Sequence, residues 1–339
     1  MTSIHSSEAV TLSRASYVTT DGGPRFPAIP SPTAGQGSQA PNLSALHHYR
    51  TMGLVASADT YLEPPRTFRV ANAPPAVLRG SVGPSGTNRI SDVRRVQERL
   101  AELGFPVWAD GLYGPNTAHG LAMFRAIVEG REQLAPFRLR PGTTLERVLF
   151  SDQAPRWQQL PRRGTGFILT DSDDYGWGTN TAAAVMARAG VRYMTEFRQH
   201  HPDRALIGVN DISRRDGSVI VHRGSPEHET HRTGLDIDVR LPRRPGSDRR
   251  WGTKTNWRSY DREATYAMIR AFALDSAVER ILFADRVLIG RASREQQPWA
   301  HKLIYDRGHN DHFHVDVEKP DVGTTNPSHR ASGGSQVAA

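Results

Sequence analysis

Hydrophobic residues between positions 89 and 135 recur about every 3.6 residues, which is the period of an α-helix. A first helix is expected from about Asp92, whose side chain can cap it, to Gly104. The run Asp-Gly-Leu-Tyr-Gly-Pro at 110–115 predicts a turn, and a second helix begins at about Asn116. The inward positions are expected to be Val93, Val96, Leu100 and Leu103, then Leu121, Phe124 and Ile127. The pattern predicts a small all-α module.

Helical and extended segments alternate from residue 159 to about residue 322. Helices are predicted at Thr179–His200 and Asp261–Ala273. Strands are predicted at Ala205–Val209, Val219–His222, Leu235–Val239 and Asp311–Val317, with further short strands within Val278–Ile289. Because the segments lack regular βαβ spacing, we expect an α+β fold with a small antiparallel sheet flanked by helices.

Three further stretches have no such periodicity. Residues 1–88 are rich in Pro, Gly, Ser, Thr and Ala, and are predicted to be an irregular tail or linker. Residues 136–158 are predicted to link the helical module at 89–135 to the α+β domain at 159–322. Residues 323–339 are predicted to be a disordered tail.

The 339 residues include no cysteine, which excludes disulfides and thiolate metal ligands. A transition-metal site must therefore use histidine and carboxylate. The net charge of +8 comes almost entirely from scattered arginines; this is compatible with codon bias in a GC-rich genome or with attraction to a polyanion such as cell wall or nucleic acid. No run approaches the ~20 apolar residues that span a bilayer, and Met1–Thr20 has no apolar segment typical of a secretory signal.

The segment His312–Val317 alternates polar and apolar residues. In a strand, side chains two residues apart lie on the same face. His312, His314 and Asp316 should therefore share one face, and the residues between them should face the core. Two histidines so spaced can reach one metal centre, where one binds the metal and the other acts on water or substrate.

A second cluster precedes the predicted strand at 235–239. Asp236 and Asp238 should share one face of that strand, and a turn near Gly234 can bring His231 back beside Asp238. An imidazole and a carboxylate are two of the three protein ligands of a catalytic zinc site, and His314 is the natural third. The pair His228 and His231 does not match the His-Glu-x-x-His helix of zincins, because it is one residue too short.

Two stretches resemble known families. The first, from Asp92 to Phe124, has Leu103-Gly104-Phe105 and Asp110-Gly111-Leu112-Tyr113-Gly114 in order. It is similar to the peptidoglycan-binding type 1 domain, a three-helix cell-wall module, over about 40 residues, although Arg125 stands where that family usually has glutamine. The resemblance implies binding to bacterial peptidoglycan.

The second resemblance spans roughly residues 160 to 322. His231-Arg232-Thr233-Gly234-Leu235-Asp236-Ile237-Asp238, His309-Asn310-Asp311-His312-Phe313-His314-Val315 and Gly208–Ser213 resemble the LAS metallopeptidases, and within them the penicillin-insensitive murein endopeptidases. Thr230 stands where that family often has serine.

This resemblance implies that His231, Asp238 and His314 bind one zinc ion. His312 would be the catalytic histidine, His309 a further active-site histidine, and Asp236 a group outside the ligand set.

The two resemblances together predict a zinc-dependent peptidoglycan hydrolase that cleaves a cross-link amide. Without an export signal, such an enzyme would be made in the cytoplasm and reach the wall by phage lysis, a virion or an injection device, with residues 1–88 as a candidate contact to other subunits. A structural, inactive component of such an assembly is an alternative, and a metal-dependent nuclease is a minor one. We expect no nucleic acid or membrane partner.

Overall fold

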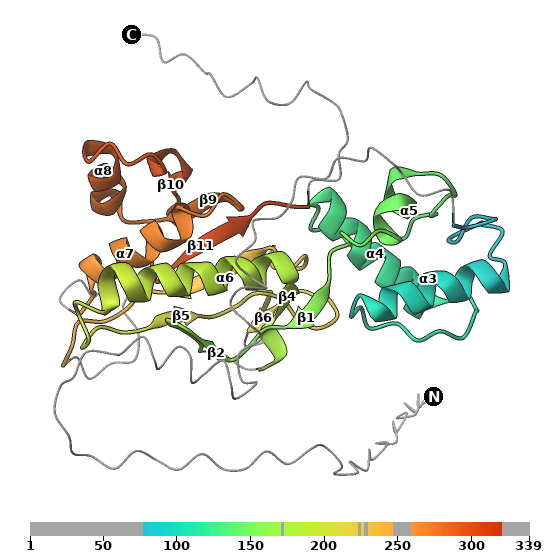
Figure 1. Ribbon diagram of the computed structural model, residues 1–339, viewed down its shortest axis with the longest axis horizontal. Helices are drawn as coiled ribbons and strands as arrows, with labels where there is room; N and C mark the ends of the chain where they lie inside the picture. The colour runs from blue at the N-terminus through green and yellow to red at the C-terminus, as the bar shows by residue number, and fades with distance from the viewer. Residues whose placement is uncertain (1–76, 171–172, 223–224, 227–229, 247–258, 321–339) are drawn as a thin grey trace, which may run out of the picture. The chain divides into compact units, whose positions relative to one another are not determined.

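The computed structural model describes residues 77–170, 173–222, 225–226, 230–246 and 259–320 (Figure 1). Most of the predicted irregular segment at 1–88, the predicted tail at 323–339, and His228 lie outside the described residues. Elements carry the labels of Figure 1.

The first part of the described chain is helical. Its helices are α3 (Ile90–Glu102), α4 (Pro115–Glu129) and α5 (Thr144–Leu149). Every inward position predicted for the first two helices is buried, which confirms their hydrophobic pattern. The predicted cap is wrong, because α3 begins two residues before Asp92. The Asp92 carboxylate instead accepts the backbone N–H of Arg79 at 3.1 Å, and so holds the segment that precedes the helix.

The helical module is wider than its predicted bounds of 89–135. Helix α5 lies in the stretch predicted as a linker, and its buried Glu146 accepts the backbone N–H of Leu78 at 2.8 Å. Val82 and Leu139 exchange backbone hydrogen bonds of 2.9 and 2.8 Å. These contacts join residues about 60 positions apart, so no local period could reveal them.

Seven strands form one mixed sheet in the described chain, in the order β10-β9-β11-β8-β5-β3-β2. Their bounds are β2 (Arg163–Gly164), β3 (Phe167–Leu169), β5 (Ile207–Val209), β8 (Asp236–Arg240), β9 (Val278–Phe283), β10 (Leu303–Tyr305) and β11 (His312–Val317). Strand β11 is antiparallel to both β8 and β9, but β3–β5 and β10–β9 are parallel pairs. The α+β class is confirmed, and the predicted antiparallel pairing holds at the centre of the sheet.

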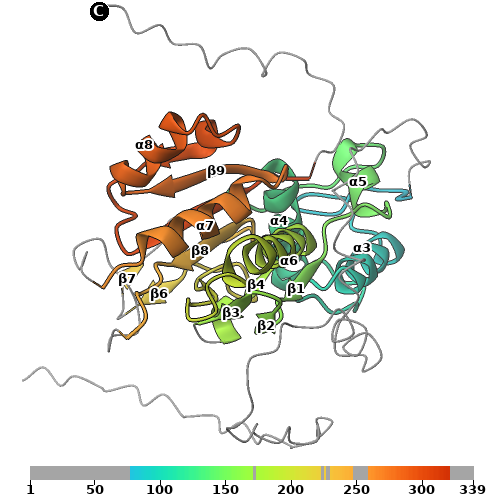
Figure 2. The ribbon, with the colours of Figure 1, turned by 60° about the vertical axis from the view of Figure 1, so that its left-hand side comes forward.

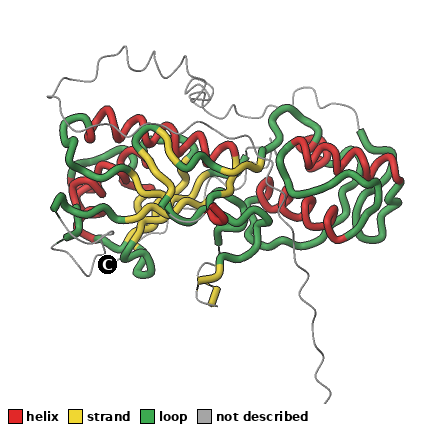
Figure 3. The backbone as a smooth tube through the Cα atoms, turned by 90° about the horizontal axis from the view of Figure 1, so that it is seen from below, coloured by secondary structure: helices red, strands yellow, loops and turns green. Residues whose placement is uncertain are grey.

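Two short ladders lie outside this sheet. Strands β1 (Trp157–Gln159) and β4 (Trp177–Thr179) pair with each other, and β6 (Val221–His222) pairs with β7 (Ser225–Pro226). Figure 3 shows the main strands gathered together, with helices alongside them.

Helices α6 (Asn180–Tyr193) and α7 (Arg262–Ala273) lie side by side on one face of the sheet (Figures 1 and 2). Thr179 and Asp261 cap them by accepting backbone N–H groups. Phe313 of β11 contacts Phe272 of α7, with ring centroids 6.0 Å apart. Since side chains alternate along a strand, His312 and His314 point to the opposite face, as predicted.

Helix α8 (Arg286–Arg294) corrects one prediction. Its first turn falls within Val278–Ile289, where only strands were expected. Asp285 ends the extended segment, because its carboxylate accepts the N–H of Val287 at 2.9 Å and begins a helix. Short elements complete the fold: η1 (Asp173–Tyr175), η2 (Met194–Arg198) and η4 (Ala300–Lys302). Among the described residues, no helix is long and apolar enough to cross a membrane.

A buried ion pair ties α6 to the turn after α7. Arg188 donates to both carboxylate oxygens of Asp275, at 2.6 and 2.9 Å. Asp275→Ala leaves this guanidinium buried without its carboxylate, so we expect a loss of about 3–5 kcal/mol in the free energy of unfolding, measured by urea denaturation. Asp203→Ala, which removes an exposed carboxylate, should change it by less than about 0.5 kcal/mol. Equal effects of the two variants would contradict this role.

Candidate metal centre

The pairing of β8 with β11 brings the two sequence motifs together. The antiparallel register sets His314 directly opposite Asp238, and Asp316 opposite Asp236. Opposite residues on one face of a sheet have Cβ atoms about 4.5–5.5 Å apart, within reach of a shared ion. The Nδ1 atom of His314 lies 2.8 Å from Oδ1 of Asp238. Strand register therefore brings two of the predicted ligands together.

His231 reaches the same point from a turn. Its backbone has a φ of +70°, which is rare for a residue with a side chain, and Gly234 follows with a φ of +63°. The turn brings Nε2 of His231 to 3.4 Å from Oδ2 of Asp238. A side chain at Gly234 is excluded, because a Cβ there would lie 2.5 Å from the Cα of Gly178 and 2.6 Å from the ring of Trp157.

One ligand atom from each of His231, Asp238 and His314 lies within 4.8 Å of the others. The three residues are only 0, 2 and 4% exposed. Two imidazoles and a carboxylate form a donor set that transition metals accept. This buried cluster could hold a metal ion.

Outer hydrogen bonds orient both histidines toward that point. His231 donates from Nδ1 to the carbonyl oxygen of Ile212 at 3.1 Å, which turns Nε2 to Asp238. His314 donates from Nε2 to Asp236 at 3.2 Å and to Asp316 at 3.1 Å, so its Nδ1 faces Asp238. Ligand histidines in metal sites commonly donate their second N–H to a carboxylate or carbonyl in this way. Asp236, His314 and Asp316 form a second set of close ligand atoms that could also hold a metal ion.

Charge inside the cluster favours a cation. Burial lowers the pKa of His314, but hydrogen bonds to Asp236, Asp238 and Asp316 outweigh it and raise the pKa to about 12. Burial raises the pKa of Asp238, yet the neighbouring His231 and His312 hold it well below its usual range. The carboxylate of Asp238 thus stays ionised and needs positive charge beside it, which protons on the histidines or a metal ion can supply.

The segment at 208–213 holds the ligand strand by its backbone. The N–H of Asn210 donates to the carbonyl oxygen of Asp238 at 2.8 Å, and the N–H of Asp238 donates to that of Asp211 at 3.0 Å. Ile212 supplies the carbonyl that orients His231. The segment at 208–213 therefore fixes the positions of Asp238 and His231.

The two remaining predicted residues lie beside the ligands. Nε2 of His312 is 3.7 Å from Oδ1 of Asp238, and its Nδ1 is 2.8 Å from Oδ1 of Asp311. Nδ1 of His309 is 2.9 Å from Oδ1 of Asp306, and its ring centroid lies 4.9 Å from that of His312. Their side chains are 19 and 18% exposed, so both are partly accessible from solvent. The structure brings all five predicted residues together.

The electrostatics of these two histidines differ. Burial lowers the pKa of His309, with repulsion from the neighbouring histidines, despite its bond to Asp306. Burial also lowers the pKa of His312, but Asp238 and Asp311 reverse this and raise it.

Several contributing groups were missed in the sequence. Asp311 is adjacent to His312, so an acidic partner for that imidazole could have been inferred. Asp306 lies three residues before His309, in a loop whose conformation no periodic pattern predicts. Glu132, which contacts the His231 turn, comes from the helical module about 100 residues away. Burial raises the pKa of Glu132 to about 7, and the charge of Asp236 adds to the effect.

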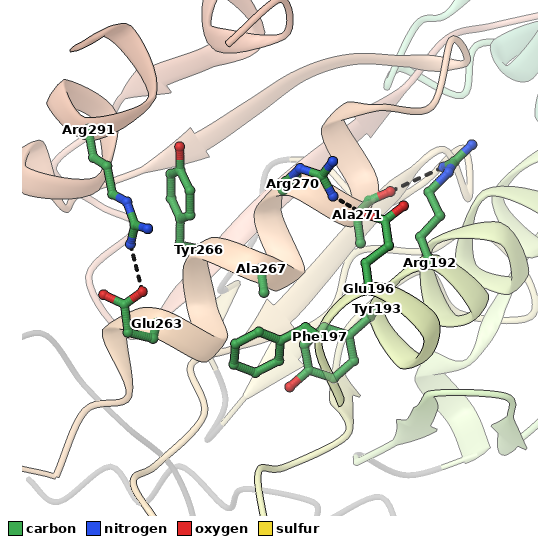
Figure 4. Close-up of a pocket in the computed structure, with 10 residues that line it drawn as sticks. All are labelled: Arg192, Tyr193, Glu196, Phe197, Glu263, Tyr266, Ala267, Arg270, Ala271 and Arg291. Atoms are coloured by element: carbon green, nitrogen blue, oxygen red, sulfur yellow. Dashed lines mark hydrogen bonds and ion pairs between the residues drawn. The ribbon is translucent and has the colours of Figure 1, made fainter. Parts of the chain in front are cut away.

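A pocket of about 530 Å³ lies elsewhere, along α6, α7 and α8 (Figure 4). Four of its charged side chains form two pairs: Arg291 donates to Glu263 at 2.7 Å, and Arg270 pairs with Glu196. None of the five predicted site residues lines it. The histidine cluster, rather than this pocket, is therefore the candidate functional site.

Neither a protein-family model nor a curated protein matches the chain. The family resemblance therefore rests on the sequence motifs.

The glycine turn gives a direct test of how His231 is positioned. Gly234→Ala should cost at least about 2 kcal/mol in the free energy of unfolding, because it adds backbone strain to contacts with Gly178 and Trp157. It should also weaken metal binding, measured by competition with a chelator. Gly246→Ala is the matched control, since that glycine also has a positive φ, of +77°, and a Cβ added there would lie within 4 Å of no other atom among the described residues. If both variants bound metal like the parent, the turn would not position His231.

Proposed function

We propose that this protein is a zinc-dependent peptidoglycan hydrolase that cleaves a peptide cross-link amide. The observation that carries the proposal is the buried cluster of His231, Asp238 and His314 beside two histidines that each lie within 3 Å of an aspartate carboxylate. Two histidines and one carboxylate are a ligand set of catalytic zinc sites, which keep a fourth position for water or substrate. Zinc at this position would activate a water molecule and polarise the scissile carbonyl.

The aspartate-bonded histidines supply the proton transfers. Asp311 holds Nδ1 of His312 and so keeps Nε2 directed to the ligand cluster. His312 then takes the proton of the attacking water or stabilises the oxyanion of the tetrahedral intermediate. The proton taken from the water then passes to the leaving amine, from His312 itself or through the adjacent ring of His309, which lies beside Asp306.

The substrate class is supported by the helical module and by net charge. The module at 77–150 has the buried pattern of a folded domain, and its sequence resembles wall-binding modules. A net charge of +8 favours approach to an anionic wall. The resemblance favours cleavage of the cross-link between D-Ala and a diamino acid.

The nuclease alternative is disfavoured because His312–Val317 is a strand, whereas the His-Asn-His nucleases need a helix in their ββα-metal unit.

Substitutions should separate metal binding from proton transfer. Asp238→Ala and His314→Ala should abolish both bound zinc and digestion of purified sacculi, because each removes a ligand. His312→Ala should retain zinc and lose about 10²–10⁴-fold in rate, the usual contribution of a positioned acid or base. Zinc per chain is measured by plasma mass spectrometry, and turbidity of sacculi gives the rate.

The control is His301→Ala, which removes an exposed histidine on η4 and should change neither readout. Full digestion by His314→Ala would show that the ligand assignment is wrong. A zinc-loaded parent that digests no sacculi would favour the structural alternative.

The products identify the bond. Digestion of sacculi should convert cross-linked muropeptide dimers to monomers, detected by mass spectrometry, and a chelator should stop it until zinc is restored. Dimers that stay intact while only stem termini are trimmed would indicate a carboxypeptidase. Cleavage of plasmid DNA with intact sacculi would contradict the proposal.

A further inference from the structure

Glu132 follows helix α4 in the helical module, yet its carboxylate contacts the turn that carries His231. Oε2 of Glu132 accepts the backbone N–H of Arg232 at 2.9 Å. Oε1 lies 3.0 Å from the hydroxyl oxygen of Thr233. Glu132 therefore binds the two residues that directly follow the first metal ligand, about 100 positions along the chain.

The contact continues to the last ligand. The Thr233 hydroxyl lies 3.3 Å from Oδ2 of Asp236, and Oδ1 of Asp236 accepts the Nε2–H of His314 at 3.2 Å. Thr233 is 1% exposed and Asp236 5%, so water competes little with these bonds. The chain Glu132–Thr233–Asp236–His314 thus connects the module to the imidazole that lies against Asp238.

One hydroxyl proton serves two carboxyl groups in this chain. Thr233 can donate to Glu132 or to Asp236, but not fully to both. Burial raises the pKa of Glu132 to about 7, and a protonated Glu132 can donate to Thr233 while Thr233 donates to Asp236. A glutamine at 132 would offer the same pattern: an oxygen for the N–H of Arg232 and an N–H for Thr233.

The turn also needs support from outside itself. His231 has a φ of +70°, a conformation that persists in a residue with a side chain only where neighbouring contacts hold it. The helical module supplies a further contact beside this turn. Nε2 of His119 on α4 lies 2.7 Å from the carbonyl oxygen of Asp216, and Arg232 donates to the carbonyl oxygen of Gly217 at 3.0 Å.

We infer that Glu132 is a positioning residue of the metal centre, which fixes the His231 turn and, through Thr233 and Asp236, the orientation of His314. The helical module is then a structural part of the metal site as well as a candidate wall anchor. The inference rests on the metal centre of the proposed function, but not on its substrate.

Cobalt(II) titration of the full chain tests this inference, with the visible absorption of cobalt reporting ligand geometry and a competing chelator reporting affinity. Glu132→Ala should weaken cobalt binding by about 10–100-fold and alter the spectrum, as loss of an outer hydrogen-bond partner does in other metal sites. Glu132→Gln should bind within about twofold of the parent, because it keeps both hydrogen bonds.

Glu129→Ala is the matched control. It removes the carboxylate of the last residue of α4, three positions before Glu132, and the described side chains that pair with this carboxylate are Arg125 and Arg131. It should bind cobalt like the parent. Thr233→Val breaks the link to Asp236 at nearly constant volume, and it should also lose at least about tenfold in affinity. It tests the inference even if Glu132→Ala does not fold, which thermal unfolding of the metal-free variants reveals.

Parent-like affinity in both Glu132→Ala and Thr233→Val would overturn the inference. Equal losses in Glu132→Gln and Glu132→Ala would also overturn it, because they would show that the hydrogen-bond pattern is irrelevant. A parent that binds cobalt but leaves sacculi intact would overturn the proposed function alone. A parent that binds no cobalt would overturn both.

Discussion

The candidate centre depends on one interaction, the antiparallel pairing of β8 with β11 in a register that sets His314 opposite Asp238. A shift of one residue would turn every side chain on β11 to the other face, so that the histidines would enter the core and Phe313 would leave it. The core prevents that shift, because Phe313 and Val315 are fully buried beneath the helices. The apolar residues of the strand thus fix the polar face that can bind metal.

Ligand geometry then depends on hydrogen bonds from groups outside the ligand set. The Ile212 carbonyl orients His231, while Asp236 and Asp316 orient His314. Several ionised groups are buried within a few ångströms of one another, an arrangement that is unfavourable unless opposite charge balances it. A divalent cation would meet that requirement, and the turn at His231 places a third side chain that could bind it.

Alternation and helical periodicity were enough to predict both α3 and α4, the strand at His312–Val317 and the shared face of His312 and His314, because these features repeat locally. A turn near Gly234 and the alternation of the following strand also predicted His231 beside Asp238. In the structure that turn brings His231 to Asp238, and the strand register brings His314. Contacts between distant segments could not be predicted. The contacts of Glu146 with Leu78 and of Glu132 with Thr233 follow no local period, and the helix at Arg286–Arg294 begins where an aspartate cap interrupts an apolar run.

X-ray absorption at the zinc edge of the zinc-loaded protein tests the central claim most directly. The account predicts one zinc per chain bound by two imidazole nitrogens and a carboxylate oxygen at about 2.0–2.2 Å, with the remaining position taken by water. The two-histidine signal should fall to one in His314→Ala. A spectrum with only oxygen ligands, or one that His314→Ala leaves unchanged, would contradict the account.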